Sequence, residues 1–230
     1  MTAAADPADD VLPAERALPL ARLGLLAMDM DSTAITIECI DEIADFAGVK
    51  ADVAAVTEAA MRGEIDFAQS LRRRVACLEG LPVRVLAEVY AERLRPSPGL
   101  AELLAHVHAH GVRTLLVSGG FTYFTERLRA RFGYTWTRAN TLGERDGRLT
   151  GQVCGAIVDA AEKERMLRFV AGTLPAARAL SIAIGDGAND LPMLRAATLG
   201  VAYRAKPAVR AAVPVAINRG GLDAVNTLLL

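Results

Sequence analysis

The sequence predicts an α/β domain that is built on a parallel sheet and interrupted by a helical insert. Short apolar runs that end in glycine or aspartate alternate with segments of helical periodicity, which is the pattern of a parallel sheet covered by helices. Residues 38–95 break this alternation, because they carry helical periodicity and no strand candidate. The 230 residues, 52% of them hydrophobic, are enough for one domain with an insert and a substantial core.

The first 22 residues, rich in alanine, proline and aspartate, are expected to form a poorly ordered or loosely docked lead-in. They contain no basic segment followed by an apolar core, so they do not resemble a secretory signal peptide. No apolar run approaches the roughly 18 residues that a membrane-spanning helix needs. Cys39, Cys77 and Cys154 are too widely spaced for a disulfide framework or a zinc motif. We therefore expect a cytoplasmic protein that does not interact with a membrane.

The charge balance excludes another class of partner. Lysine and arginine total 26 against 27 for aspartate and glutamate, and the formal net charge is −1. A protein that binds nucleic acid through phosphate contacts carries a basic excess, and this chain has none. We expect a small molecule as the partner, and the sequence does not indicate the oligomeric state.

The first strand is expected over residues 23–28, where the run LGLLAM is apolar throughout, as in a strand buried on both faces. The helical block of residues 38–95 is divided by glycines into about four helices. This block follows the carboxyl end of the first strand, and open α/β sheets bind their ligands at that edge. It is therefore placed to act as a lid. The expected domains are therefore a core of residues 23–37 and 96–230 and a cap of residues 38–95.

The rest of the chain alternates between strands and helices. The dipeptide Asp146-Gly147 stands between two alternating arms and predicts a β-hairpin over residues 140–153. The other expected strands are 112–117, 180–185 and 198–203, and the expected helices are 100–111, one ending near Phe132, 160–172 and one opening near Pro192.

Polar residues stand where three of these strands end. Asp29 and Asp31 follow the first strand, Ser118 and Gly119 follow the second, and Asp186 follows the strand at 180–185. Residues two apart in an extended chain point to the same side, so Asp29 and Asp31 can face one site. Three neighbouring carboxylates require a cation. Carboxylate oxygens favour Mg²⁺ or Ca²⁺ over soft metals, and Mg²⁺ is usual in phosphate chemistry.

An anionic substrate at this place needs hydrogen-bond donors and a positive charge. The segment SGG at 118–120 offers a hydroxyl and unhindered backbone N–H groups, and Ser32 and Thr33 add hydroxyls beside the first strand. Lys163 can supply a point charge at a phosphate. These residues indicate a magnesium-dependent phosphoryl-transfer site in which an aspartate can be the nucleophile. His106, His108 and His110 have no carboxylate or cysteine nearby, which favours a solvated helix end over a metal site.

Four segments resemble the motifs of the haloacid dehalogenase superfamily, namely DMDST, SGGF, Lys163 and GDGANDLPM. The helical stretch that starts at Ile37 resembles the cap of the phosphoserine phosphatases, and the similarity runs from about Gly24 to the C-terminus. The resemblance implies a Rossmann-like core with an inserted helical cap. It also implies hydrolysis of O-phospho-L-serine to L-serine and phosphate through an aspartyl-phosphate, the last step of serine biosynthesis. The 22 leading residues are too few for the regulatory domain of many bacterial relatives.

The resemblance assigns the chemistry to the aspartates. Asp29 would be the nucleophile, and Asp31 would protonate the leaving oxygen and then activate water. Mg²⁺ would be held by the Asp29 carboxylate, the Asp31 backbone carbonyl and Asp186. Asp190 would orient Lys163 or a water on the metal ion.

The resemblance also assigns the substrate contacts. Ser118, Gly119 and Lys163 would hold the phosphoryl oxygens, and Asn189 would contact the substrate or its phosphate. Glu38 and Arg74 would bind the amino and carboxylate groups of phosphoserine. Phe67 and Met61 would form the apolar wall of the lid.

The physical chemistry of the substrate agrees with the last assignment, since an ammonium and a carboxylate call for one anionic and one guanidinium partner. Helix geometry alone leaves Arg72, Arg73 and Arg74 as equal candidates for the guanidinium, and the choice of Arg74 depends on the resemblance.

Two other interpretations stay open. The chain could be a phosphatase or phosphotransferase of the same superfamily that acts on another small phosphomonoester, which Glu38 and Arg74 argue against. It could also be a receiver-type signalling module with a phospho-accepting aspartate. Receivers are about half this length and lack both the helical insert and the second aspartate, so this interpretation is disfavoured.

Overall fold

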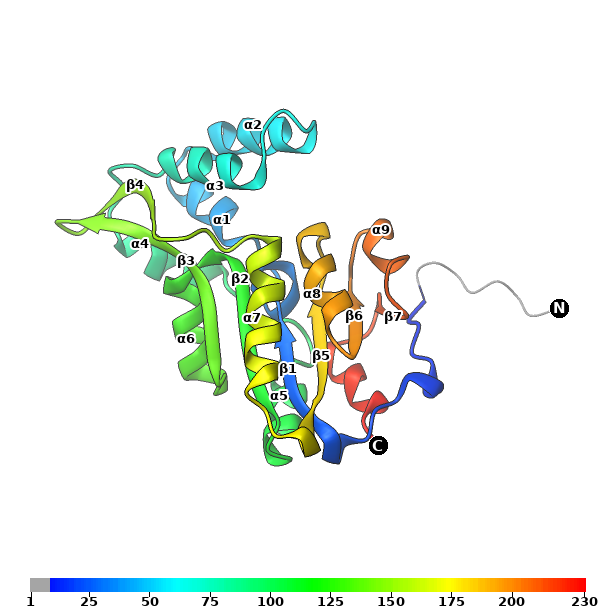
Figure 1. The fold of residues 1–230 in the computed structure, drawn as a ribbon. Helices are drawn as coiled ribbons and strands as arrows, with labels where there is room; N and C mark the ends of the chain where they lie inside the picture. The colour runs from blue at the N-terminus through cyan, green and yellow to red at the C-terminus, as the bar shows by residue number, and fades with distance from the viewer. Residues whose placement is uncertain (1–8) are drawn as a thin grey trace.

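The computed structural model describes residues 9–230, and within that range one seven-stranded sheet forms the centre of the molecule (Figure 1). Its strand order is β4-β3-β2-β1-β5-β6-β7. Neighbouring strands are parallel except for β3 and β4, which are antiparallel. The strands are β1 (Leu23–Met28), β2 (Arg113–Phe121), β3 (Trp136–Arg145), β4 (Arg148–Cys154), β5 (Leu180–Gly185), β6 (Leu199–Tyr203) and β7 (Val215–Ile217). The predicted α/β class with a parallel sheet is confirmed.

Helices cover both faces of the sheet because β1 is apolar on both of its faces. Leu25 and Ala27 pack on one side, in a cluster with residues of α7 (Ala160–Gly172) and α8 (Leu191–Ala196). Leu26 and Met28 point the other way, into the larger cluster. The helices of that second side are α5 (Leu100–Ala109) and α6 (Thr122–Phe132). The short helix α9 (Pro207–Arg210) lies between β6 and β7.

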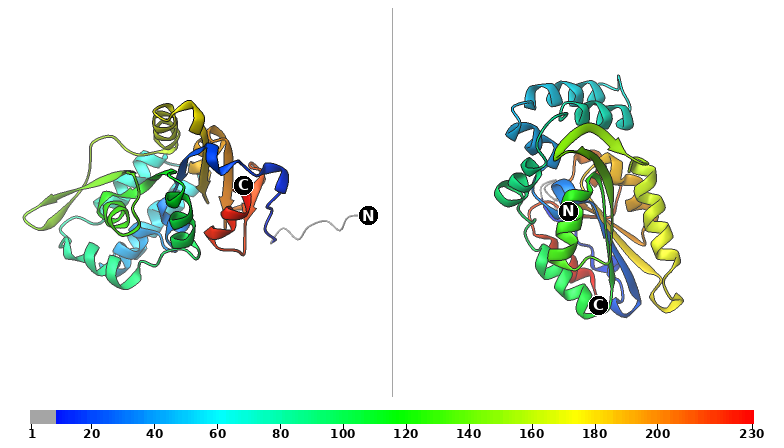
Figure 2. Two further views of the ribbon diagram at one scale, coloured as in Figure 1. Left: turned by 90° about the horizontal axis from the view of Figure 1, so that it is seen from below. Right: turned by 90° about the vertical axis from the view of Figure 1, so that its left-hand side faces the viewer.

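The insert between β1 and β2 is helical, as expected. It contains α1 (Cys39–Phe46), α2 (Lys50–Met61), α3 (Phe67–Ala76) and α4 (Arg84–Glu88), followed by one helical turn at Val89–Arg93. Helices α1, α2 and α3 lie beyond the carboxyl ends of the parallel strands (Figures 1 and 2). In this position they can close over a ligand bound at the sheet edge.

The hairpin at Asp146-Gly147 is confirmed, and both turn residues have the positive φ angles of 51° and 72° that a tight hairpin turn needs. Strand β3 starts earlier than expected, at Trp136, and its first residues pair in parallel with β2. The far end of the hairpin bonds to the cap. Leu149 accepts from the Gly80 N–H at 2.8 Å and donates to the Leu81 carbonyl at 2.8 Å. The cap therefore contacts the core through this hairpin as well as through its own two connections.

The start of the described chain is docked on the core, so residues 9–22 follow the docked one of the two alternatives expected for the lead-in. The Asp10 carboxylate accepts hydrogen bonds from the backbone N–H groups of residues 218–220, and Val11 bridges to Ala216. The short strand β7, which sequence periodicity did not reveal, lies beside this contact. The rest of that expectation, on residues 1–8, lies outside the described residues. No helix in the described range is long and apolar enough to cross a membrane.

Candidate active site

A cavity of about 450 Å³ lies between the carboxyl edge of the sheet and the cap. The core contributes the ends of β1, β2 and β5 and one lysine from the loop after β6. The cap contributes side chains of α1, α2 and α3. The charged residues in the lining are Asp29, Asp31, Asp186 and Lys206 from the core and Glu38, Asp41 and Arg74 from the cap or its first turn. The structure thus brings the expected strand-end residues into one site.

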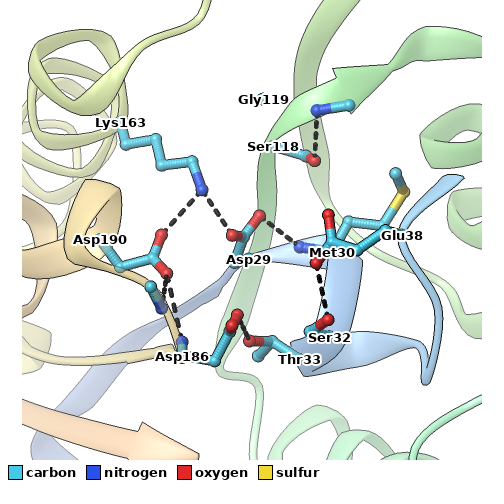
Figure 3. Close-up of polar contacts among 12 residues, drawn as sticks. Asp29, Met30, Ser32, Thr33, Glu38, Ser118, Gly119, Lys163, Asp186 and Asp190 are labelled. Carbon is cyan, nitrogen blue, oxygen red and sulfur yellow. Dashed lines mark hydrogen bonds and ion pairs between the residues drawn. The ribbon is translucent and has the colours of Figure 1, made fainter. Parts of the chain in front are cut away.

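Asp29, Lys163 and Asp190 form a buried ionic cluster at the base of the cavity (Figure 3). The Lys163 ammonium lies 2.6 Å from Asp29 Oδ2 and 2.7 Å from Asp190 Oδ1. Asp29 Oδ1 accepts from the Met30 N–H at 2.7 Å, and Asp190 Oδ2 accepts from the N–H groups of Asp186 and Gly187. The direct contact between Asp190 and Lys163 supports the expected role of Asp190 in orienting the lysine.

Local sequence explains how Lys163 reaches this cluster. Asp159 begins α7 by accepting from the Glu162 N–H at 2.9 Å. Lys163, Leu167 and Val170 then follow at helical spacing and are the buried residues of this helix. Burial works against the charge, but Asp29 and Asp190 outweigh it and raise the pKa of Lys163. The lysine stays protonated at the base of the site.

The negative charge of the carboxylates at the base of the cavity exceeds the positive charge of the side chains bonded to them. Oxygens of Asp29, Asp186 and Asp190 lie within 4.8 Å of one another. Burial and the charge of Asp190 raise the pKa of Asp29 well above its usual range and the pKa of Asp186 to about 6. Three carboxylates facing one ammonium leave two negative charges, which a divalent cation balances. The donor set is all oxygen, so these residues fit Mg²⁺.

Asp31 differs from Asp29 because none of the described residues bonds a cationic side chain to it. Its Oδ1 accepts from the Cys39 N–H at 3.3 Å, and its Oδ2 lies over Gly120. A Cβ at position 120 would stand 2.6 Å from that oxygen and 2.8 Å from Met30 Cε, so any side chain there would displace the Asp31 carboxylate or Met30. Burial, together with the charge of Glu38, raises the pKa of Asp31 to about 7. A carboxyl group with this pKa can both give and take a proton near neutral pH.

Residues 118–120 line the cavity at the end of β2, the strand next to β1. The register between β2 and β3 shifts between Val117 and Phe121, so the intervening segment has no paired residue on β3. The Ser118 hydroxyl is buried and accepts from the Gly120 N–H at 2.8 Å. Asn140 holds this segment, because its amide donates to the Gly119 carbonyl at 2.8 Å.

Arg74 lies on the cap side of the cavity. This position distinguishes it from its two neighbouring arginines. Ser70, Leu71 and Val75 form the buried side of α3, and Arg74 stands on the same side and lines the cavity, while Arg72 and Arg73 are exposed. Burial lowers the pKa of Arg74, although Asp41 and Glu38 oppose that shift. Among the described residues, no partner bonds to its buried Nε. The structure thereby singles out one arginine where helix geometry left three.

The other expected cap residues divide into two groups. Phe67 lines the cavity and approaches Gly119 so closely that a Cβ on that glycine would lie 3.0 Å from its ring. Glu38 lines the cavity next to Asp31. The prediction for Met61 concerns a side chain outside the part of the chain that the structure describes.

Two expectations need correction or restriction. The Ser32 and Thr33 hydroxyls do not point to an open anion site, because Ser32 donates to Glu38 at 2.7 Å and Thr33 to Asp186 at 2.9 Å. Carboxylates are the nearest strong acceptors, so they take both hydroxyls. Lys163 is fully buried and is not part of the cavity lining, so it reaches the site through Asp29. Asn189 does line the cavity.

Sequence reasoning missed Gly120, Asn140 and Lys206. The first was quoted only as part of SGG, and its close approach to Asp31 depends on tertiary contacts. Asn140 lies inside a hairpin arm, where nothing in the pattern marks it. Lys206 follows the end of β6, and the strand-end argument that found Asp29 and Asp186 would have found it as well.

Comparison with known proteins gives a consistent result. The family model of the haloacid dehalogenase-like hydrolases matches residues 26–195. A phosphoserine phosphatase of Polaromonas sp. is 54% identical over 211 residues, which cover 90% of this chain and 89% of that protein. The unliganded crystal structure of a probable phosphoserine phosphatase from Vibrio cholerae superposes with a TM-score of 0.85 at 46% identity, covering 94% of this chain and 67% of that one. A phospho-aspartyl intermediate analogue of phosphoserine phosphatase superposes with a TM-score of 0.81 at 33% identity, covering 91% of this chain and 100% of that one.

Proposed function

The chain belongs to the haloacid dehalogenase-like hydrolases, and from this premise we propose that it is a phosphoserine phosphatase. Its reaction is the hydrolysis of O-phospho-L-serine to L-serine and inorganic phosphate through an aspartyl-phosphate. Relatives that share about half of its residues over most of its length carry this activity in their names.

One observation in the cavity carries the choice of substrate. Arg74 Nε is buried without a hydrogen-bond partner among the described residues, and the guanidinium faces the same cavity as Glu38. A buried guanidinium donor without an acceptor is unfavourable until a ligand supplies one, and a carboxylate fits it in a bidentate manner. The Glu38 carboxylate suits an ammonium. An amino acid with a phosphorylated side chain presents both groups.

In the first step, an Asp29 oxygen attacks phosphorus, and the bond between phosphorus and the serine oxygen breaks. Asp31 donates its proton to that oxygen, so that serine leaves as a neutral alcohol. Lys163 has three N–H donors and uses two of them on Asp29 and Asp190. Once the phosphoryl group is bonded to Asp29, the third donor can bind one of its oxygens and stabilise the charge that develops there.

In the second step, water attacks the phosphorus of the aspartyl-phosphate, and Asp31, now ionised, takes the proton of that water. Phosphate leaves and Asp29 is restored. Asp31 suits both steps because its pKa of about 7 leaves the two protonation states close in free energy at neutral pH. Phe67, packed against Gly119 over the cavity, limits the access of bulk water to this intermediate.

We assign Mg²⁺ as the cofactor, held by the carboxylates of Asp29 and Asp186 and the backbone carbonyl of Asp31. The bound ion would neutralise the excess negative charge of the site and polarise a phosphoryl oxygen. The support for this assignment is the cluster of Asp29, Asp186 and Asp190, whose donors are all oxygens and whose three carboxylates face one ammonium.

The proposed function is tested by phosphate release from phosphoserine, phosphothreonine and phosphoethanolamine, each with and without Mg²⁺. We expect Mg²⁺-dependent turnover with the highest kcat/KM for phosphoserine. Equal rates on all three substrates would indicate a general phosphatase of small phosphomonoesters. No Mg²⁺-dependent release from any of them would contradict the proposal.

A further inference from the structure

We propose that Lys206 binds the phosphate group of the substrate at the mouth of the cavity and again when inorganic phosphate leaves. This inference rests on the proposed function and adds a phosphate-binding residue outside the buried cluster. Lys206 follows β6, directly before α9, and its side chain is exposed and lines the same cavity as Asp29 and Arg74. Its backbone N–H donates to the Asp186 carbonyl at 3.3 Å, which ties its position to the loop that carries Asp186.

The charges of the lining leave Lys206 as the cation that meets the phosphate first. Five carboxylates line the cavity, and they repel a phosphate dianion on its way to Asp29. Two cations line it, Arg74 on the cap and Lys206 on the core. Under the proposed function Arg74 binds the substrate carboxylate, and the ammonium of Lys163 is buried beneath Asp29.

Lys206 is also available to a ligand. Within the described part of the chain, no carboxylate forms a salt bridge with it, although Asp29, Asp31 and Asp186 line the same cavity. A cation that is left unpaired beside an excess of acidic groups can bind an anionic ligand without first breaking an ion pair. This is the property that a site for both entering and leaving phosphate requires.

The choice of lysine at this position is informative, because lysine is rare in the chain. It occurs at three positions, while lysine and arginine together number 26. Lys163 belongs to the buried cluster, and Lys50 is on the cap, paired with Asp45 at 3.2 Å. An ammonium on a flexible stem can follow a phosphate as it moves, which the rigid fork of arginine does less well.

The kinetic test compares Lys206→Met with Lys206→Arg on phosphoserine and phosphoethanolamine at fixed Mg²⁺. We expect Lys206→Met to lower kcat/KM about tenfold on both substrates at low salt, the lower end of what electrostatic steering supplies. The loss should shrink at high salt. The inhibition constant of inorganic phosphate should rise by a similar factor, kcat should change less, and Lys206→Arg should retain most of the wild-type value.

Each alternative has its own result. A loss on phosphoserine alone would mean that Lys206 binds the substrate carboxylate, and it would overturn the proposal. An unchanged inhibition constant for phosphate together with a fall in kcat would assign Lys206 a structural role and would overturn it too. If the wild-type protein turned over neither substrate, the proposed function would fail, and the binding experiment below would still decide on Lys206.

The binding experiment observes the lysine directly. In a Lys50→Arg variant, the exposed lysine that remains is Lys206, because Lys163 is buried. Reductive methylation with ¹³C-formaldehyde labels accessible amines, and the resonance that is absent after a further Lys206→Arg change is that of Lys206. We expect this resonance of the Mg²⁺-loaded protein to shift on titration with inorganic phosphate, with saturation at the phosphate inhibition constant. A resonance that does not move while phosphate inhibits would overturn the proposal.

Discussion

The two sides of the cavity are built differently. On the core side, Asp29, Lys163 and Asp190 are buried and joined by contacts of 2.6 and 2.7 Å. On the cap side, Arg74 is half-buried with an unpartnered Nε, and Glu38 is exposed and bonded to Ser32. The core side is organised before any ligand arrives, whereas the cap side obtains its partners from the ligand.

This difference separates chemistry from selection. Charges that develop during the reaction are best stabilised by groups that are already oriented and shielded from water, and the core provides these. A site that leaves a donor unpaired until the right substrate binds discriminates against analogues that lack the matching group. Changes to the buried aspartates of the core should therefore lower turnover strongly on every substrate, and the loss of Arg74 from the cap should alter the ranking of substrates.

The largest effect is expected for Asp29→Asn. An amide is a poor nucleophile and a weaker metal ligand, so turnover should fall by more than about 10⁴-fold on all substrates, and no acid-labile phospho-enzyme should form. Rapid quenching after mixing with labelled phosphoserine measures both quantities. Asp45→Asn, on the outer side of the cap, is the control and should behave like wild type. A normal phospho-enzyme burst in Asp29→Asn would assign the nucleophile to another residue.

The next effect is expected for Asp31→Asn. Loss of the acid and base should lower kcat by about 10²–10⁴-fold on every substrate. Mg²⁺ binding should persist, because the proposed ligand is the backbone carbonyl and not the side chain. Steady-state kinetics measure the fall in kcat, and Mg²⁺ titration by calorimetry measures the retained affinity for the metal. Lost Mg²⁺ affinity with a high residual rate would reverse the assignment.

A smaller and selective effect is expected for Arg74→Ala. Its kcat/KM on phosphoserine should fall by about 2–4 kcal/mol in activation free energy, roughly 30- to 1,000-fold, because the substrate carboxylate loses its partner. Phosphoethanolamine has no carboxylate, so its lower kcat/KM should change little and the two substrates should converge. Arg73→Ala, an exposed neighbour, is the matched control.

Glu38 provides the complementary experiment on the cap side. Glu38→Gln should lower kcat/KM on both substrates, since both carry an ammonium. If Arg74→Ala were to reduce both substrates equally, the arginine would support the lid or the phosphate, and the choice of phosphoserine would lose its main physical argument.

The smallest effect concerns stability and distinguishes the two sides without turnover. Burial, aided by Glu38 for Asp31 and by Asp190 for Asp186, raises the pKa of Asp31 to about 7 and of Asp186 to about 6, from a usual value of 3.8. At a pH between the usual and the raised pKa, such a group binds a proton when the protein folds. The metal-free protein should therefore gain stability as the pH falls from about 7 toward 4. At Asp186, a proposed metal ligand, protons then compete with Mg²⁺ for the same carboxylate oxygens.

The measurement is the Mg²⁺-induced change in Tm at pH 7.5 and pH 5.5. At about 100 times its Kd, Mg²⁺ should add about 2.7 kcal/mol at pH 7.5, or about 5–11 °C in Tm, and clearly less at pH 5.5. Arg74→Ala should show the wild-type pattern, because the cap holds no metal ligand. A larger Mg²⁺ effect at pH 5.5 would contradict the assignment of the site.

Much of the fold was accessible from periodicity, and the exceptions have physical causes. Strands β1, β5 and β6 were predicted within about a residue, because central parallel strands are apolar on both faces and contrast with the helices around them. Strand β7 has only three residues, too few for a periodic signal. The docking of residues 9–22 depends on the Asp10 carboxylate and three backbone N–H groups more than 200 residues away along the chain, which no local pattern encodes.

The sequence by itself determined which residues could form the site. Carboxyl ends of parallel strands meet at one edge, so Asp29, Ser118 and Asp186 could be placed together from their positions after three apolar runs. Tertiary structure decided which of these side chains are buried and which partners they bind. It assigned the Ser32 and Thr33 hydroxyls to carboxylates and buried Lys163 beneath Asp29. It also turned Arg74 inward. Burial, pairing and the orientation of α3 arise from contacts between segments that are distant in the chain, and neither hydrophobic period nor motif spacing specifies which of several neighbouring side chains makes them.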